Sequence, residues 1–209
     1  MRRNNLVEGL VYMEVTRGVA ERDFAFPKDA KPTVVMFTQV KTITRSPQAE
    51  SGVAVITVPD LRWKRRDIKS VALLAQVLAK QEAAEAGVYE AWMVEDGFVT
   101  EGGSSTAFII TADRRIVTRP LSTAVLPGIT RQSVMRLAEE TGLTVEERPF
   151  TLDEAFGAAE AFLTSASSFV MPVVMIDGKA VGAGKPGPST RRLRELYLEM
   201  ARGNAAAAA

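Results

Sequence analysis

The sequence predicts an α+β fold in which mostly antiparallel sheet packs against helices. Strand-like and helix-like segments do not alternate strictly along the chain, and several short strands follow one another with turn residues between them. The length of 209 residues, of which 46% are hydrophobic, suffices for one large domain or two small ones.

Three strands are predicted in the first part of the chain, at residues 10–15, 33–40 and 52–58. Val11, Met13 and Val15 alternate with other residues, which predicts one buried face for the first strand. The third strand is apolar on both faces, which predicts burial between layers. Residues 44–51 are polar around Pro47, and we interpret them as a linker or domain boundary.

The later elements follow from periodicity and turn residues. A helix is predicted at 71–86, with its apolar stripe buried and Gly87 as its end. Turn sequences separate the next four strands as in an antiparallel meander, at 89–94, 98–100, 107–111 and 115–118. The remaining helices are predicted at 129–141, at 151–156 and from just after Pro188-Ser189 to about residue 201. The remaining strands are predicted at 144–148, 160–164 and 173–176. Thr151 and Glu154 form a capping-box pattern.

Composition narrows the possible functions. The net charge of +1 gives no broad basic surface, so we expect neither nucleic acid nor membrane as a partner. The chain has no cysteine and no histidine, and therefore lacks the thiol nucleophile, the commonest general base and the preferred zinc ligands. We expect no metal site. No signal peptide or transmembrane stretch is evident, so a cytoplasmic protein is expected.

Lys69 is the residue that we expect to be catalytic. It lies in Asp67-Ile68-Lys69-Ser70, just before the apolar helix, where burial would lower the pKa of its amine and let it attack a carbonyl group. The alternative is an ordinary solvated lysine, which is how we interpret Lys64 and Lys80. The basic run Lys64-Arg65-Arg66 is interpreted as a solvated edge.

Three other segments could carry chemistry. Residues 99–105 place Glu101 at a strand end before two glycines and two serines, although a plain polar turn is equally compatible. Residues 127–131 open a helix, where free N–H groups and the Thr130 hydroxyl could bind an anion or simply form an N-cap. Residues 164–168 form a hydroxyl-rich strand exit.

One further motif is set aside. Residues 182–187 match G-x-G-x-x-G, but they follow a hairpin in a chain without a βαβ unit, and Pro186 removes an N–H that a phosphate site would use. We interpret this segment as a loop.

Several motifs occur in the order found in one enzyme family. They are Arg62-Trp63, Asp67-Ile68-Lys69-Ser70, Ala79-Lys80-Gln81-Glu82-Ala83, Tyr89-Glu90-Ala91, Val99-Thr100-Glu101-Gly102, Leu126-Pro127-Gly128-Ile129-Thr130-Arg131 and Glu147-Arg148-Pro149-Phe150. With them the chain resembles class IV aminotransferases, the fold-type IV pyridoxal-phosphate enzymes, and most of all the D-amino-acid (D-alanine) type.

The resemblance implies a set of cofactor contacts. Lys69 would form an imine with pyridoxal 5'-phosphate and shuttle the substrate Cα proton, and Glu101 would face the pyridine nitrogen. The other implied cofactor-binding residues are Ser104, Ser105, Leu126, Ile129, Thr130, Ser165 and Ala166.

Two positions depart from the family pattern. Arg22 would bind the substrate carboxylate, but Phe24 stands where a histidine is usual, and Thr106 stands where asparagine is usual.

The resemblance also implies a domain plan. Residues 1–45 would be the remainder of a small N-terminal domain that begins before Met1 in the family, residues 46–203 the cofactor-binding domain, and residues 204–209 a disordered tail. We expect a homodimer that transaminates a D-amino acid with a 2-oxo acid such as 2-oxoglutarate. The alternatives are branched-chain L-amino-acid transamination, aminodeoxychorismate lysis, or an inactive cofactor-binding fragment.

Overall fold

The structure is a computed structural model that describes residues 2–207, with the side chains of residues 3–203. The chain divides into two compact units between Ser46 and Pro47, one residue from the predicted border. Among the described residues, no helix is long and apolar enough to cross a membrane.

The first unit is a two-stranded hairpin with a short 3-10 turn, η1 (Arg2–Asn4), before it. Strand β1 (Gly9–Thr16) pairs antiparallel with β2 (Thr33–Val40). Tyr12 and Phe37 stack across the pair with ring centroids 4.9 Å apart. The prediction of one buried face for the first strand is wrong, because Val11, Met13 and Val15 are all exposed.

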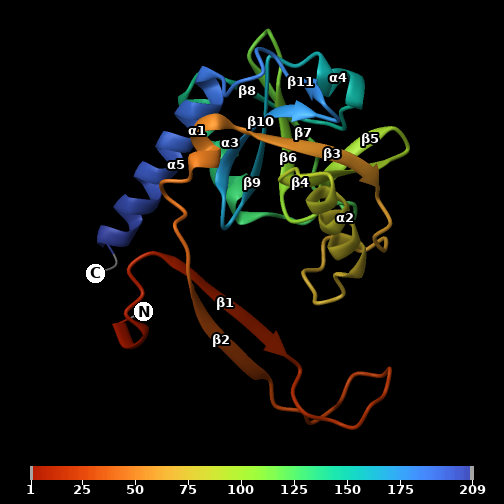
Figure 1. The fold of residues 1–209 in the computed structure, drawn as a ribbon. Coiled ribbons are helices and arrows are strands. Elements are labelled where there is room, and N and C mark those ends of the chain that lie inside the picture. Colours follow the sequence, from red (N-terminus) through yellow and green to blue (C-terminus); the bar gives the residue numbers. More distant parts are fainter. Residues whose placement is uncertain (1, 208–209) are drawn as a thin grey trace. The chain divides into compact units, whose positions relative to one another are not determined.

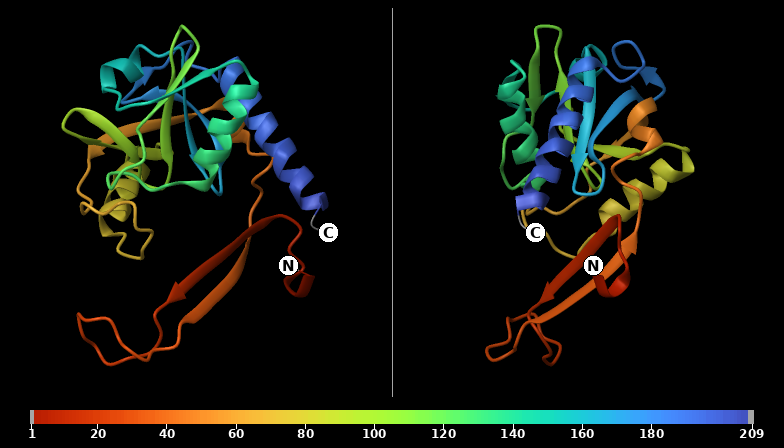
Figure 2. Two further views of the ribbon diagram at one scale, coloured as in Figure 1. Left: turned by 180° about the vertical axis from the view of Figure 1, so that it is seen from behind. Right: turned by 90° about the vertical axis from the view of Figure 1, so that its left-hand side faces the viewer.

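The second unit is built on a nine-stranded sheet, which Figures 1 and 2 show from three sides. Its strands are β3 (Val53–Pro59), β4 (Glu90–Glu95), β5 (Phe98–Gly102), β6 (Thr106–Ile110), β7 (Arg115–Thr118), β8 (Thr144–Glu147), β9 (Glu160–Ser165), β10 (Phe169–Ile176) and β11 (Lys179–Ala180). Their order is β5-β4-β3-β10-β9-β6-β7-β8, with β11 on β10. Pairing is mostly antiparallel, and β3 is parallel to both of its neighbours.

The predicted meander is only half present. β4 pairs with β5 and β6 pairs with β7, but β5 lies at one edge of the sheet whereas β6 pairs with β9. The turn that begins after β5 therefore carries the chain from one part of the sheet to another. Turn chemistry alone does not reveal such a crossing.

In the described part of the second unit, five helices are present: α1 (Pro47–Ser51), α2 (Leu74–Glu85), α3 (Ile129–Glu140), α4 (Leu152–Phe156) and α5 (Pro188–Ala207). The predicted linker thus ends in the short helix α1. Thr151 and Glu154 form the predicted capping box at the start of α4. α5 continues to Ala207 through part of the predicted disordered tail, since alanine has the highest helix propensity; residues 208–209 lie outside the described residues.

Successive side chains of a strand point to opposite faces of the sheet, so neighbouring residues of one strand belong to different hydrophobic clusters. On β6, Ala107 and Ile109 join one cluster, while Phe108 and Ile110 join the cluster under α3 and α5. A third cluster packs Ala79 and other residues of α2 on β3 and β4. The candidate site lies where β5 and the start of α3 meet.

Candidate active site

Glu101 is a buried carboxylate on β5, with 4% of the residue exposed. The Arg62 guanidinium forms an ion pair with Oε1 of Glu101. The backbone N–H of Leu126 donates to both carboxylate oxygens, at 3.3 and 3.2 Å. Burial raises the pKa of Glu101, although Arg62 and the Leu126 hydrogen bond act in the opposite direction.

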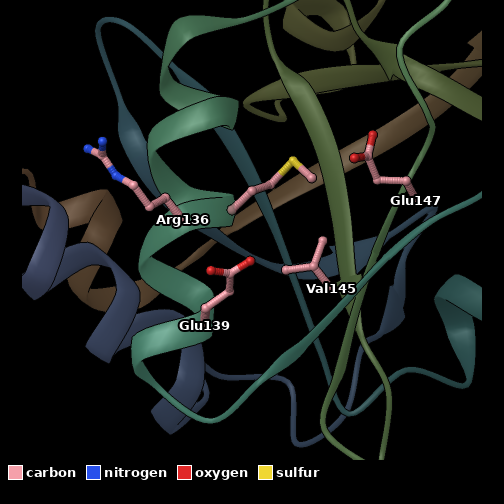
Figure 3. Close-up of a pocket in the computed structure, with 5 residues that line it drawn as sticks. Arg136, Glu139, Val145 and Glu147 are labelled. Carbon is pink, nitrogen blue, oxygen red and sulfur yellow. The ribbon is translucent and has the colours of Figure 1, made fainter.

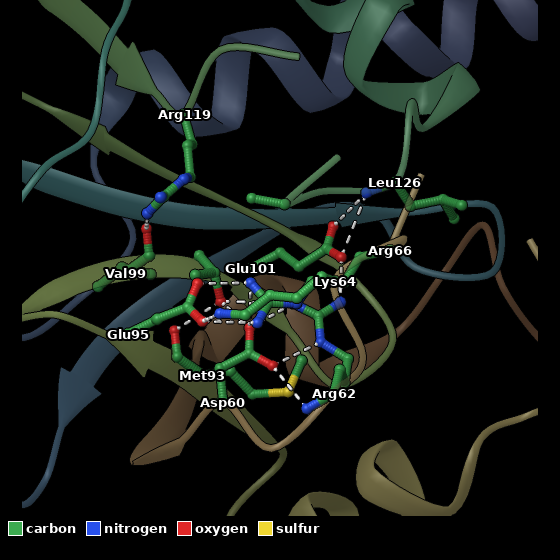
Figure 4. A network of polar contacts seen from close by, with 12 residues as sticks. Asp60, Arg62, Lys64, Arg66, Met93, Glu95, Val99, Glu101, Arg119 and Leu126 are labelled. Carbon is green, nitrogen blue, oxygen red and sulfur yellow. Dashed lines mark hydrogen bonds and ion pairs between the residues drawn. The ribbon is translucent and has the colours of Figure 1, made fainter. Parts of the chain in front are cut away.

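Buried charges hold Arg62 in place (Figure 4). Asp60 accepts hydrogen bonds from Arg62 Nε at 2.9 Å and Nη2 at 2.6 Å, and from the Thr100 hydroxyl at 2.6 Å. Arg66 donates to both carboxylate oxygens of Glu95, at 2.8 and 2.9 Å. The loop between β3 and α2 is therefore fastened to β4 and β5.

Arg66 corrects the interpretation of the basic run as a solvated edge. Lys64 and Arg65 are exposed, but only 5% of Arg66 is. Its burial is tolerated because Asp60 and Glu95 both pair with it.

The start of α3 offers hydrogen-bond donors. Gly128 is the N-cap and no side chain caps the helix. The N–H groups of Ile129 and Thr130 therefore have no acceptor within the helix. The Thr130 hydroxyl is buried and has no hydrogen-bond partner among the described residues. An anion at this position would satisfy these groups.

The turn between β9 and β10 adds a group of hydroxyls. Ser165 Oγ lies 2.7 Å from Ser168 Oγ and accepts the backbone N–H groups of Ser167 and Ser168 at 3.3 and 3.1 Å. Ala166 is exposed in the same turn. The Ser165 hydroxyl thus stabilises its own turn.

Strand register brings this turn close to the start of α3. Thr164, just before Ser165, pairs across β9 and β6 with Thr106, and the Thr164 hydroxyl is buried without a described partner. A Cβ atom on Gly128 would lie 3.3 Å from the Thr106 hydroxyl, so the helix start packs against β6. The helix start, which could bind an anion, and the hydroxyl-rich strand exit are therefore neighbours.

Ser104 and Ser105 bind Glu90 of β4. Both hydroxyls donate to its Oε2, at 2.8 and 3.2 Å, and Lys80 forms an ion pair with its Oε1 at 3.3 Å. Lys80 also donates to the Tyr89 carbonyl, so Lys80 is only partly solvated. The pairing of Glu90 orders the turn after Glu101, a role that the sequence did not reveal.

Lys69 lies in the loop before α2 and is exposed. Lys64 and Lys80 are ion-paired, whereas Lys69 has no hydrogen bond or ion pair among the described residues. The predicted burial of Lys69 at the head of a buried helix is wrong. Small residues such as Ala79 and Ala83 face the sheet, and the stripe that contains Leu74 is exposed.

Arg22 and Phe24 belong to the loop of the first unit. The Arg22 guanidinium lies 5.2 Å from the centroid of the exposed Phe24 ring. Lys69 and Glu101, in contrast, belong to the second unit.

A surface hollow of about 530 Å³ lies between α3 and β8 (Figure 3). Arg136, Glu139, Val145 and Glu147 line it together with Met135. None of the predicted site residues lines this hollow. Its mixed charges do not converge on one ligand type, so it is not the candidate site.

The donors and acceptors fit a phosphorylated pyridine cofactor. The α3 start and the buried Thr130 hydroxyl suit a phosphate group, and the buried Glu101 carboxylate suits a protonated ring nitrogen. The backbone N–H of Leu126, two residues before the N-cap Gly128, donates to Glu101. One short segment of the chain therefore joins the candidate phosphate site to the carboxylate that would face the ring nitrogen.

Sequence comparison identifies similar proteins. The family profile "Amino-transferase class IV" matches residues 1–176. A D-alanine aminotransferase of Bacillus licheniformis is 42% identical over 193 residues, which cover 91% of this chain and 67% of that protein. A D-alanine aminotransferase of Staphylococcus aureus (strain MSSA476) is 41% identical, over 93% of this chain and 68% of that protein.

Comparison with solved structures also finds an aminotransferase. A branched-chain amino acid aminotransferase from Thermobaculum terrenum, solved in its PLP-form (holo-form), superposes with a TM-score of 0.77 at 28% identity. The match covers 92% of this chain and 64% of that one, so the chain spans about two thirds of the length of its relatives. The chain belongs to the class IV aminotransferases, a family of pyridoxal-phosphate-dependent transferases.

Proposed function

We propose that the chain transfers an amino group from a D-amino acid of the D-alanine type to a 2-oxo acid such as 2-oxoglutarate. The observation that carries this proposal is the buried Glu101 carboxylate, joined through Leu126 to the uncapped start of α3. The similarity to D-alanine aminotransferases favours the D-amino-acid substrate.

Ile129 and Thr130 would hold the phosphate of pyridoxal 5'-phosphate, with the turn at Ser165 and Ala166 completing the phosphate site. Leu126, Ser104 and Ser105 would line the ring, and Lys69 would bind the cofactor covalently. When bound, the cofactor supplies the electron sink that acidifies the substrate Cα–H bond.

The residues of the chain then have separate tasks. Glu101 holds a proton at the ring nitrogen, because a buried carboxylate is a strong acceptor for a cationic N–H group. The Lys69 amine accepts the Cα proton and returns it, which suits a chain that has no histidine. Arg22 would pair with the substrate carboxylate.

A second candidate is transamination of branched-chain L-amino acids, which the similarity to the Thermobaculum terrenum structure favours. Phe24, in place of the usual histidine, adds an apolar side chain beside Arg22. Purified protein tested with D-alanine and with L-leucine separates the two functions. Formation of pyruvate from D-alanine is the expected result, and exclusive turnover of L-leucine would support the second candidate.

Borohydride trapping tests the central assignment. The protein is incubated with pyridoxal 5'-phosphate, reduced with borohydride and mapped by peptide mass spectrometry. The pyridoxyl group is expected on Lys69, and Lys69→Ala is expected to abolish both colour and transamination. Lys64→Ala, at an exposed lysine of the same loop, is the control and should keep the label. A colourless wild-type protein, or a label on Lys64 or Lys80, would contradict the proposal.

The resemblance to the family also suggests a homodimer in the cytoplasm that acts on small molecules. Sedimentation equilibrium of the purified chain is expected to give twice the mass of 22.6 kDa. A monomer at micromolar concentration would contradict the dimer without affecting the chemistry.

A further inference from the structure

Asp60 has a fully buried side chain and no chemistry of its own in the proposed function. It directly follows β3. Its Oδ2 accepts hydrogen bonds from Arg62 and Thr100, each at 2.6 Å, and lies 3.4 Å from Nη1 of Arg66. Its Oδ1 accepts the Arg62 backbone N–H at 3.1 Å and Nε at 2.9 Å. Both oxygens are thus saturated by the protein, which leaves no room for a ligand.

Two carboxylates share the Arg62 guanidinium (Figure 4). Nε and Nη2 face Asp60, while Nη1 faces Glu101. Burial alone would raise the pKa of Asp60, but the hydrogen bonds from Arg62 and Thr100 lower it, so Asp60 is a carboxylate at neutral pH. The positive charge of Arg62 is therefore partly neutralised by Asp60 where Arg62 pairs with Glu101.

Asp60 also joins the two segments that would carry the reaction. Arg62 and Arg66 belong to the loop that leads to Lys69, and Thr100 directly precedes Glu101 on β5. All three side chains meet at Oδ2 of Asp60. A substitution that alters this oxygen would therefore affect both the loop that leads to Lys69 and the strand that carries Glu101.

We infer that Asp60 is a positioning residue, which holds Arg62 against Glu101 and balances its charge, so that Glu101 can keep a proton at the ring nitrogen of the cofactor. Without Asp60 the full positive charge of Arg62 would act on Glu101. Glu101 would then become a weaker base and hold that proton less well. The inference rests on the proposed function, because it needs Glu101 to face the cofactor.

Carbon-13 NMR of the Glu101 carboxyl group tests this in the protein without cofactor. Asp60→Asn keeps the shape of the side chain but removes its charge, and the pKa of Glu101 is expected to fall by roughly one unit. The matched control is Asp113→Asn, because Asp113 also pairs with an arginine two residues later, Arg115, but through one hydrogen bond and in an exposed turn. The control should leave the Glu101 titration unchanged. An unchanged titration in Asp60→Asn would overturn the inference.

The cofactor-loaded protein gives a second readout. Asp60→Asn should still bind pyridoxal 5'-phosphate at Lys69, with the pH midpoint of the cofactor's absorbance change shifted and turnover reduced roughly tenfold. A merely structural role would weaken binding or stability but leave that midpoint in place. Absence of the Lys69 label in wild-type protein would instead refute the proposed function, whereas the Glu101 titration needs no cofactor.

Folding of Asp60→Asn is checked first by circular dichroism, since the substitution leaves Arg62 with less buried counter-charge. If it does not fold, Arg62→Gln is compared with Asp60→Asn/Arg62→Gln, in which both charges are removed. Glu101 is expected to have the lower pKa in the double variant, because the negative charge of Asp60 also acts on Glu101 directly and raises its pKa. Equal titrations in the two variants would overturn the inference.

Discussion

Glu101 and Thr130 differ in how the protein satisfies their polar atoms. The Glu101 carboxylate has partners on two sides, whereas the Thr130 hydroxyl is buried without one among the described residues. A buried polar group without a partner is costly and needs an explanation. Substitutions at these two positions therefore probe different parts of the proposed cofactor site.

Glu101→Gln is expected to retain the cofactor but to lower turnover by roughly 100-fold. The amide keeps the size and hydrogen bonding of the side chain but cannot hold the ring nitrogen protonated. Turnover and cofactor affinity are measured separately, by a coupled assay and by absorbance titration. Unchanged turnover would reduce Glu101 to a structural ion-pair partner of Arg62.

Thr130→Val should separate stability from binding. The valine removes an unpartnered buried hydroxyl, so the cofactor-free protein should be as stable as wild type or more stable by about 1 kcal/mol. The affinity for pyridoxal 5'-phosphate should fall roughly tenfold, because one hydrogen bond to a charged phosphate is lost. Thermal unfolding and fluorescence titration measure the two effects. Equal affinity in variant and wild type would exclude the phosphate role.

Single residues were predictable from sequence where local pattern suffices. The strand end at Glu101 and the helix start at Thr130 follow from turn residues and periodicity, and the structure has both there. The ion pairs of Arg62 with Glu101 and of Arg66 with Glu95 were not predictable, because they depend on which strands become neighbours. The roles of all these residues in catalysis stay predictions.

Among the elements, α2 shows why an apolar stripe can mislead. Its leucines are exposed and Ala79 and Ala83 pack on β3 and β4, because small side chains allow the helix to approach the sheet closely. The capping box of α4 was predictable, since it needs only residues three positions apart.

The loop between β3 and α2 depends on a carboxylate of β4. Hydrogen bonds from Arg66 and Lys64 lower the pKa of Glu95 from 4.5 to about 2. Since the pKa is lower in the folded state, these bonds stabilise the fold above pH 4.5, and the stabilisation is lost as the pH falls toward 2.

Glu95→Gln should therefore lower the free energy of unfolding at pH 7 by about 1 kcal/mol, near the upper end for partly exposed ion pairs. The difference from wild type should shrink as the pH falls from 4.5 to about 2. Urea denaturation at several pH values measures it. Glu139→Gln, at an exposed residue of α3, is the control with no expected difference. A difference that does not change with pH would rule out the ion pairs as its source.

At the scale of the whole molecule, the three hydrophobic clusters all lie in the second unit. The first unit is a two-stranded hairpin, which by itself has marginal stability in water. Sequence reasoning found the described strands of both units except β11, but it could not give the order of the sheet, because β5 and β6 are adjacent in the chain and do not pair with each other.

Residues 47–209 expressed alone should therefore fold cooperatively, whereas residues 1–46 alone should not. Thermal unfolding followed by circular dichroism checks both. A gradual, non-cooperative transition for residues 47–209 would show that the second unit depends on the first.

The parallel pairing of β3 with β10 has a consequence for synthesis of the chain. Thr57, next to the end of β3, hydrogen-bonds to Asp177, just after β10, although the two are 120 residues apart in the chain. During translation at roughly 5–20 residues per second, the edge of β3 that pairs with β10 stays unpaired for a time on the order of ten seconds, until β10 is synthesised. An apolar strand with an open edge can pair wrongly with other chains in that interval. The nascent protein is therefore most exposed to aggregation before β10 leaves the ribosome.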